Sequence, residues 1–97
     1  MSDIDIEQLE LAAHRLRAIA HPLRIALISM LQEKEKLCVT DIYSKLGIEQ
    51  ATASHHLNIL KTNGILISKR EGKQMYYSLK VKTLTKILDC INNCNTV

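Results

Sequence analysis

The spacing of the apolar residues changes at Gly64, and this change limits the possible folds more than any other feature of the sequence. Before it, Ala53, Leu57 and Leu60 recur at the three- and four-residue spacing of an amphipathic helix. After it, residues 65–79 have the composition of two strands around a Glu-Gly turn, whose glycine can adopt a positive φ. The chain is therefore expected to pass from a helix directly into a β-hairpin.

A second helix precedes this one, and the two are joined by a turn at Gly47. Thr40 can cap the first turn of the earlier helix, where Asp41 suits the positive end of the helix dipole. Glycine is typical of the position just after a helix, because that position often needs a positive φ. Two helices joined in this way predict a helix-turn-helix over about residues 40–63.

The outward face of the later helix is polar and is built from small residues. A helix that was only solvated would more often carry Glu and Lys there. Short side chains with hydrogen-bonding groups can instead approach the edges of DNA bases closely. We therefore interpret this face as a candidate surface for reading DNA. Its residues are Gln50, Ala51, Ser54, His55, Asn58 and Thr62.

Basic side chains gather in the second half of the chain and at the tip of the hairpin. Residues 1–50 carry six Lys and Arg against eight Asp and Glu, whereas residues 51–97 carry seven against two. Lys and Arg displace condensed counterions from phosphates, so a basic half points to a polyanion as partner. A hairpin with Lys69, Arg70 and Lys73 directly after a helix-turn-helix is typical of a DNA-binding wing. A solvated, lysine-rich surface is the alternative interpretation.

Two further amphipathic helices are predicted at the ends of the chain, over about residues 6–19 and 82–94. Pro22 separates the first of them from another helix, because the residue before a proline avoids helical backbone. The last helix has no obvious place inside so small a fold, and we expect the two end helices to form a homodimer interface. The predicted interface residues are Leu9, Ala13, Leu16, Leu84, Ile87, Leu88 and Ile91.

These elements predict a single domain over residues 1–97, mainly α with a small β-hairpin. The order α-α-α-α-β-β-α is that of a winged helix-turn-helix, with the wing at about residues 65–79. The chain has no Phe or Trp and only three Tyr. Its core must therefore be built from Leu, Ile, Val and Ala, which suits packed helices.

Four segments occur along the chain in a characteristic order: HPLR at 21–24, LCVTDI at 37–42, ASHHLNIL at 53–60 and GKQMYYSL at 72–79. Together they resemble the ArsR/SmtB family of bacterial repressors, and the resemblance covers about residues 8–95. It implies a homodimeric winged helix protein that binds a palindromic operator in double-stranded DNA. It also implies a repressor that an inducer releases from that operator.

The resemblance further implies which side chains meet DNA. It places Ser54 and His55 in the major groove. Polar side chains suit base edges, whereas Lys and Arg hold phosphates without reading sequence. The other implied contacts, near the groove, on the phosphates or in the wing, are Gln50, Thr52, Asn58, Lys61, Lys69, Arg70 and Lys73.

Three more residues of the resembling segments are expected to have structural roles. His21 and Arg24 match positions that shape the join between the first two helices. His56 lies next to the buried stripe of its helix. We expect it to be a packed, hydrogen-bonded histidine rather than a DNA contact.

The usual metal sites of the family lack their ligands in this sequence. The thiolate site normally reads Cys-Val-Cys and here reads Cys38-Val39-Thr40, with no cysteine earlier in the chain. The zinc site of the last helix corresponds to Val81, Thr83, Cys94 and Val97, of which only Cys94 can bind a metal. Zinc at the usual sites is therefore not expected to be the inducer.

The three cysteines leave three interpretations open. Cys90 and Cys94 are one helical turn apart and could hold As(III) or Zn²⁺ with help from Cys38 or from a second copy. They could also form a disulfide in response to oxidants or reactive sulfur. Finally, all three could be small apolar packing residues. No confident cofactor follows from them.

The sequence also carries predictions about cellular location and about rival functions. The first residues are acidic rather than a basic signal leader, and no apolar stretch is long enough to span a bilayer, so a cytoplasmic protein without a membrane partner is predicted. No enzyme is expected, because the four histidines show no metal-ligand spacing and no nucleophile or phosphate-loop motif occurs. The rival to DNA binding is a winged helix module whose outer helix face meets another protein.

Overall fold

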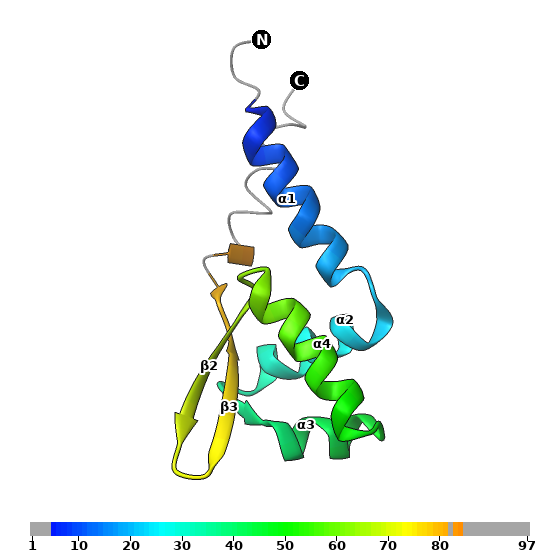
Figure 1. Ribbon diagram of the computed structural model, residues 1–97, viewed down its shortest axis with the longest axis vertical. Helices are drawn as coiled ribbons and strands as arrows, with labels where there is room; N and C mark the ends of the chain where they lie inside the picture. Colours follow the sequence, from blue (N-terminus) through cyan, green and yellow to red (C-terminus); the bar gives the residue numbers. More distant parts are fainter. Residues whose placement is uncertain (1–4, 82, 85–97) are drawn as a thin grey trace.

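The computed structural model describes residues 5–81, 83 and 84, and within them four helices and a three-stranded sheet (Figure 1). The elements are α1 (Ile6–Ile19), α2 (Pro22–Glu33), β1 (Leu37–Cys38), α3 (Val39–Leu46), α4 (Gln50–Thr62), β2 (Leu66–Glu71) and β3 (Gln74–Leu79). Val81, Thr83 and Leu84 also have helical backbone. The rest of the predicted last helix lies outside the described residues, as do the interface candidates Ile87, Leu88 and Ile91.

Local signals in the sequence account for most of the helix boundaries. The Asp5 carboxylate caps α1 by accepting a hydrogen bond from the Gln8 backbone N–H at 3.2 Å. His21 caps α2 in the same way, since its Nδ1 accepts from the Leu23 N–H at 3.1 Å. Gly47 ends α3 with a φ of 64°, a conformation that favours glycine. Each boundary satisfies backbone groups that the helix itself leaves unpaired.

The predicted cap at Thr40 is wrong. Helix α3 begins at Val39, so Cys38 occupies the capping position and makes no side-chain capping bond, while Thr40 lies inside the first turn. The reason is the pairing of β1, which keeps the backbone extended through Cys38 and no further. The Cys38 thiol instead donates a hydrogen bond to the Asp41 carboxylate at 3.2 Å.

The sheet has one strand more than the predicted hairpin. β1 pairs antiparallel with β3, with Leu37 opposite Tyr77 and Cys38 opposite Tyr76. The strand order is β1-β3-β2, so the hairpin is attached to the body of the domain through β3. Sequence reasoning found the extended segment but not its partner, because the two strands are about forty residues apart.

A core of aliphatic side chains fixes α4 against the other elements. The largest fully buried residues come from α2, α3, α4 and the start of the hairpin, and they are Leu27, Ile42, Leu57, Leu60, Ile65 and Leu66. Burying one such side chain stabilises a fold by about 1.5–3 kcal/mol. The core therefore consists of closely packed Leu and Ile side chains in place of Phe and Trp. These contacts hold α4 in one position.

Candidate nucleic-acid interface

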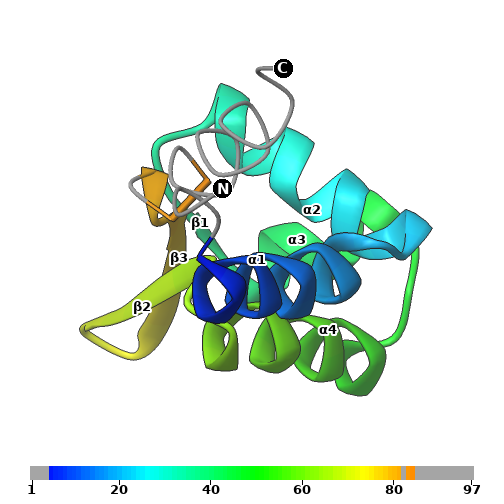
Figure 2. The same cartoon turned by 90° about the horizontal axis from the view of Figure 1, so that it is seen from above.

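The polar face of α4 is directed away from the core. Its apolar stripe, made by Ala53, Leu57 and Leu60, is fully buried. Ser54 and His55 on the opposite side are exposed. Figure 2 shows α4 along one edge of the molecule, with the hairpin projecting beyond the helical body. Among the other predicted contacts Thr52 is half-buried, and the exposed ones are Gln50, Asn58, Lys61, Lys69, Arg70 and Lys73.

His56 is packed behind this face, as expected from the sequence. It is only 6% exposed, and its Nδ1 accepts a hydrogen bond from Arg24 Nε at 3.2 Å. The His21 ring lies against it, with a distance of 4.5 Å between ring centroids. Arg24 also donates from Nη1 to the Ala18 carbonyl at 2.9 Å. The expectation that His21 and Arg24 shape the join between the first two helices is confirmed by these contacts.

The electrostatics of this cluster keep His56 neutral. Burial is the largest cause that lowers the pKa of His56 below its ordinary value, followed by the nearby His21, Arg24 and His55. Because Nδ1 accepts from Arg24, the single ring proton is assigned to Nε2. A neutral imidazole thus links the start of α2 to the back of α4.

The hairpin presents its basic side chains on a tight turn. Gly72 and Lys73 form the two-residue connection between β2 and β3, and Glu71 and Gln74 are the last pair of the ladder. The φ of Gly72 is 64°, whereas no non-glycine residue in the described part of the chain has a positive φ. A positive φ at the first central position is what a type II′ hairpin turn requires.

Two basic residues of this region were missed by sequence reasoning. Lys45 is exposed in the last turn of α3, next to the turn into α4. Its place inside the predicted helix-turn-helix could have marked it as a further phosphate contact. Lys36 lies between α2 and β1, and its Nζ donates to both carboxylate oxygens of Glu71, at 2.8 and 2.5 Å. The local sequence gives no sign of this contact, because Glu71 is 35 residues away.

The described cysteine and the described helices form no other kind of site. Cys38 is buried, and no group of three His, Cys, Asp or Glu side chains in the described part of the chain is placed to hold a metal ion. Cys90 and Cys94 lie outside the described residues. None of the described helices is long and apolar enough to cross a membrane.

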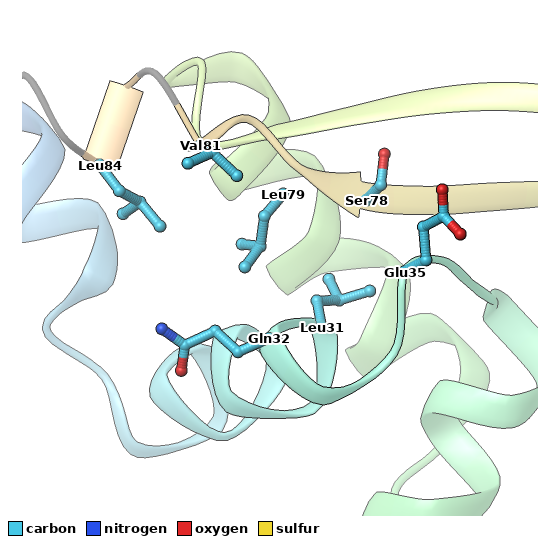
Figure 3. A pocket seen from close by; sticks show the side chains of 7 residues that line it. All are labelled: Leu31, Gln32, Glu35, Ser78, Leu79, Val81 and Leu84. Atoms are coloured by element: carbon cyan, nitrogen blue, oxygen red, sulfur yellow. The ribbon is translucent and has the colours of Figure 1, made fainter.

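An open groove of about 710 Å³ lies between the end of α2 and the end of β3 (Figure 3). Its apolar wall is formed mainly by Leu31, Leu79 and Leu84. Glu35 is its only charged lining residue among those described.

Comparisons with known proteins agree on one family. The sequence profile described as "Bacterial regulatory protein, arsR family" matches residues 21–68. An uncharacterized HTH-type transcriptional regulator of Methanocaldococcus jannaschii is 37% identical over 87 residues, which are 87% of this chain and 98% of that protein. The HTH-type transcriptional repressor SmtB of Mycobacterium tuberculosis is 37% identical over 82 residues; the match covers 84% of this chain and 60% of SmtB.

Solved structures give the same picture. The transcriptional repressor PagR of Bacillus anthracis superimposes with a TM-score of 0.73 at 33% identity, covering 87% of this chain and 99% of PagR. NolR from Sinorhizobium fredii superimposes with a TM-score of 0.74 at 29% identity, covering 98% of this chain and 94% of NolR. Both the sequence and the fold of this chain are therefore similar to those of known transcriptional regulators.

Proposed function

This chain belongs to the ArsR family of bacterial regulatory proteins, and we propose that it represses transcription by binding a palindromic DNA operator as a homodimer. The observation that carries the proposal is the division of α4 into two faces. One face is fully buried and fixes the helix, and the other is exposed, polar and free of acidic side chains. Such a helix can enter the major groove without repelling the phosphates on either side.

Base recognition is assigned to Ser54 and His55, with Gln50, Thr52 and Asn58 beside them. Ser54 and His55 are exposed in the middle of α4, and Ala51 one turn earlier adds little bulk. Hydroxyl, imidazole and amide groups offer both donors and acceptors to base edges. Short side chains such as Ala51 and Ser54 allow the backbone of α4 to come close to the bases of the groove.

Phosphate binding is assigned to basic residues at the end of α4 and on the wing. All of them are exposed, and they are Lys61, Lys69, Arg70 and Lys73. Each phosphate that such a residue neutralises releases condensed counterions. The affinity for DNA should therefore fall steeply as salt is added, for specific and nonspecific sequences alike.

The homodimer is proposed from the apolar surface that α1 leaves uncovered. Ile6, Leu11 and Leu16 are 59%, 49% and 41% exposed in the single chain. Leu9, Ala13 and Leu84, predicted for the same interface, are half-buried. A two-fold dimer presents two copies of α4 to two half-sites, and that symmetry is the reason for expecting a palindromic operator.

The proposal is tested by fluorescence anisotropy with labelled DNA from upstream of the protein's own gene, titrated with reduced protein. His55→Ala should weaken specific binding by about tenfold, as expected for the loss of a base contact. His14→Ala, which removes an exposed histidine of α1, is the matched control and should bind as the wild type does. Equal losses in both variants, or none in His55→Ala, would contradict the assignment of α4 to base reading.

The same titration, repeated with Zn²⁺, As(III) and a mild thiol oxidant, tests for an inducer. Release of the operator by one of these additives identifies the inducer class and, for the last two, implicates the cysteines. Operator binding that none of them reverses assigns the cysteines to packing, as the burial of Cys38 favours. Binding to a protein partner with no affinity for any DNA at low salt would favour the rival interaction module.

A further inference from the structure

The wing carries one acidic residue among its basic ones, and that residue is paired from outside the wing. Glu71 is the last residue of β2, next to the turn at the wing tip. Both of its carboxylate oxygens accept hydrogen bonds from Nζ of Lys36, which lies between α2 and β1. The same Nζ lies 4.8 Å from the ring centroid of Tyr76 on β3, within the range of a cation–π contact.

The strand register places Glu71 and Tyr76, the two residues that Lys36 contacts, on the same face of the hairpin. Tyr76 is opposite Lys69, and Gln74 is opposite Glu71. Because every second residue of a strand points to the same side, all four side chains lie on one face of the hairpin. β1 reaches β3 only at Tyr76 and Tyr77. Beyond that point the wing is a two-stranded ribbon, and such a ribbon has little stability of its own. Lys36 comes just before Leu37, at the end of β1 that is farther from the wing tip, and its contact with Glu71 links the ribbon to the segment between α2 and β1.

The contact also changes the charge that the wing offers to DNA. Lys69, Arg70 and Lys73 surround Glu71, whose carboxylate repels phosphate. The positive charge of Lys36 cancels the negative charge of Glu71, so the ion pair as a whole adds no net charge to the wing. The hydrogen bond with Glu71 is the largest cause that raises the pKa of Lys36, so the lysine carries its charge at neutral pH.

From this geometry we infer that Lys36 is a positioning residue for DNA binding, which acts by holding the wing tip and neutralising Glu71 rather than by touching DNA. The inference rests on the proposed function for its DNA-binding consequence. Its structural half, a wing tip ordered by Lys36, does not depend on DNA. The pair is partly solvated, with side chains 50% and 38% exposed, so its effect is expected to be modest.

A double-mutant cycle in operator affinity separates this role from direct phosphate contact. Lys36→Gln should weaken operator binding by up to about fivefold, the equivalent of an exposed ion pair. Glu71→Gln breaks the same ion pair but also removes the carboxylate that repels phosphate, so it should weaken operator binding less than Lys36→Gln does. In the Glu71→Gln background, Lys36→Gln should have no further effect, because the charge it compensates is gone.

Lys34→Gln is the matched control, since it removes an exposed lysine from the same segment. It should leave operator affinity unchanged. If Lys36→Gln weakens binding equally in both backgrounds and lowers the salt slope by about one, Lys36 contacts a phosphate itself and the inference is overturned. No effect of Lys36→Gln in either background also overturns it.

A measurement without DNA keeps the two proposals apart. Backbone order parameters for the amides of residues 70–74, measured by NMR on the free protein, should fall in Lys36→Gln and stay at the wild-type value in Lys34→Gln. Unchanged order in Lys36→Gln overturns the positioning role. A wild-type protein that binds no operator DNA, with wing order lost in Lys36→Gln, would instead count against the proposed function alone.

Discussion

Helices α1 and α4 are both amphipathic, yet the single chain buries their apolar faces to very different extents. The stripe of α4 is fully covered by the core, whereas α1 keeps large side chains such as Leu11 and Leu16 about half exposed. Only two residues of α1, both small, are buried in the described chain, and they are Ala12 and Ala18. Helix α4 is therefore held by its own chain, and α1 has apolar surface left for a partner.

The difference teaches how one short sequence can provide two kinds of surface. The polar face of α4 has a packed interior behind it, which includes the buried apolar stripe and His56 on Arg24. The apolar face of α1 keeps Ile6, Leu11 and Leu16 exposed, and in the proposed dimer a second copy would cover them. The polar face proposed for DNA and the apolar face proposed for the dimer therefore lie on different helices.

The largest effect is expected from the buried stripe of α4. Leu57→Ala should lower the free energy of unfolding by about 2–5 kcal/mol, because it removes a fully buried side chain and leaves a cavity. Urea unfolding followed by circular dichroism measures the change. Ser54→Ala on the opposite face of the same helix is the control and should change stability by less than about 0.5 kcal/mol. A loss below about 1 kcal/mol for Leu57→Ala would mean that α4 is not seated as described.

A somewhat smaller effect, and one that depends on protein concentration, is expected from α1. Leu16→Glu places a charge on the proposed interface and should weaken dimerisation by about thirtyfold or more, the size of an interface hot spot. Sedimentation equilibrium measures the dimer dissociation constant. Ile25→Glu, at an exposed apolar position of α2, is the matched control and should leave the dimer intact. Equal dimerisation of wild type and Leu16→Glu would remove α1 from the interface.

The smallest effect is expected from the histidine behind α4. The pKa of His56 is lowered in the folded chain, first by burial and then by His21, Arg24 and His55. The unfolded chain therefore binds this proton more readily, with a pKa of about 6.5. The contribution of His56 to stability is present above pH 6.5 and is lost as the pH falls through the folded-state pKa.

Urea unfolding between pH 5 and 8 measures this dependence. His56→Gln should reduce the fall in stability on acidification, whatever its effect at neutral pH, since glutamine does not titrate in this range. An identical pH profile in the variant would show that other groups cause the acid sensitivity. Leu16→Glu should keep the wild-type profile, because none of the charged or titratable groups that lower the pKa of His56 lies on α1.

Sequence reasoning succeeded where a structure is encoded by neighbouring residues. The bounds of α1 and the hairpin lie within one residue of the predicted ranges, because helical spacing, Pro22, Gly64 and Gly72 mark them locally. The outward direction of Ser54 and His55 followed from the same spacing. The family resemblance agreed with these patterns and named the function they serve.

Sequence reasoning could not predict contacts between residues that are far apart along the chain. The contact of β1 with β3, which displaced the expected cap at Thr40, joins residues that no local pattern relates. The same holds for Lys36, which belongs to a charged run at the end of α2 and yet fixes the tip of the wing. Partners of this kind are selected by the packing of whole elements.

The sequence by itself determined the helices, the hairpin and the face of α4 that is free to meet DNA, because hydrophobic spacing and turn residues act over a few positions. Only the tertiary structure decided what lies behind that face and what holds the wing. Arg24 meets His56 across 32 residues and Lys36 meets Glu71 across 35. Hydrogen bonds between such distant residues form only after the core has brought their backbones together, so their geometry belongs to the fold.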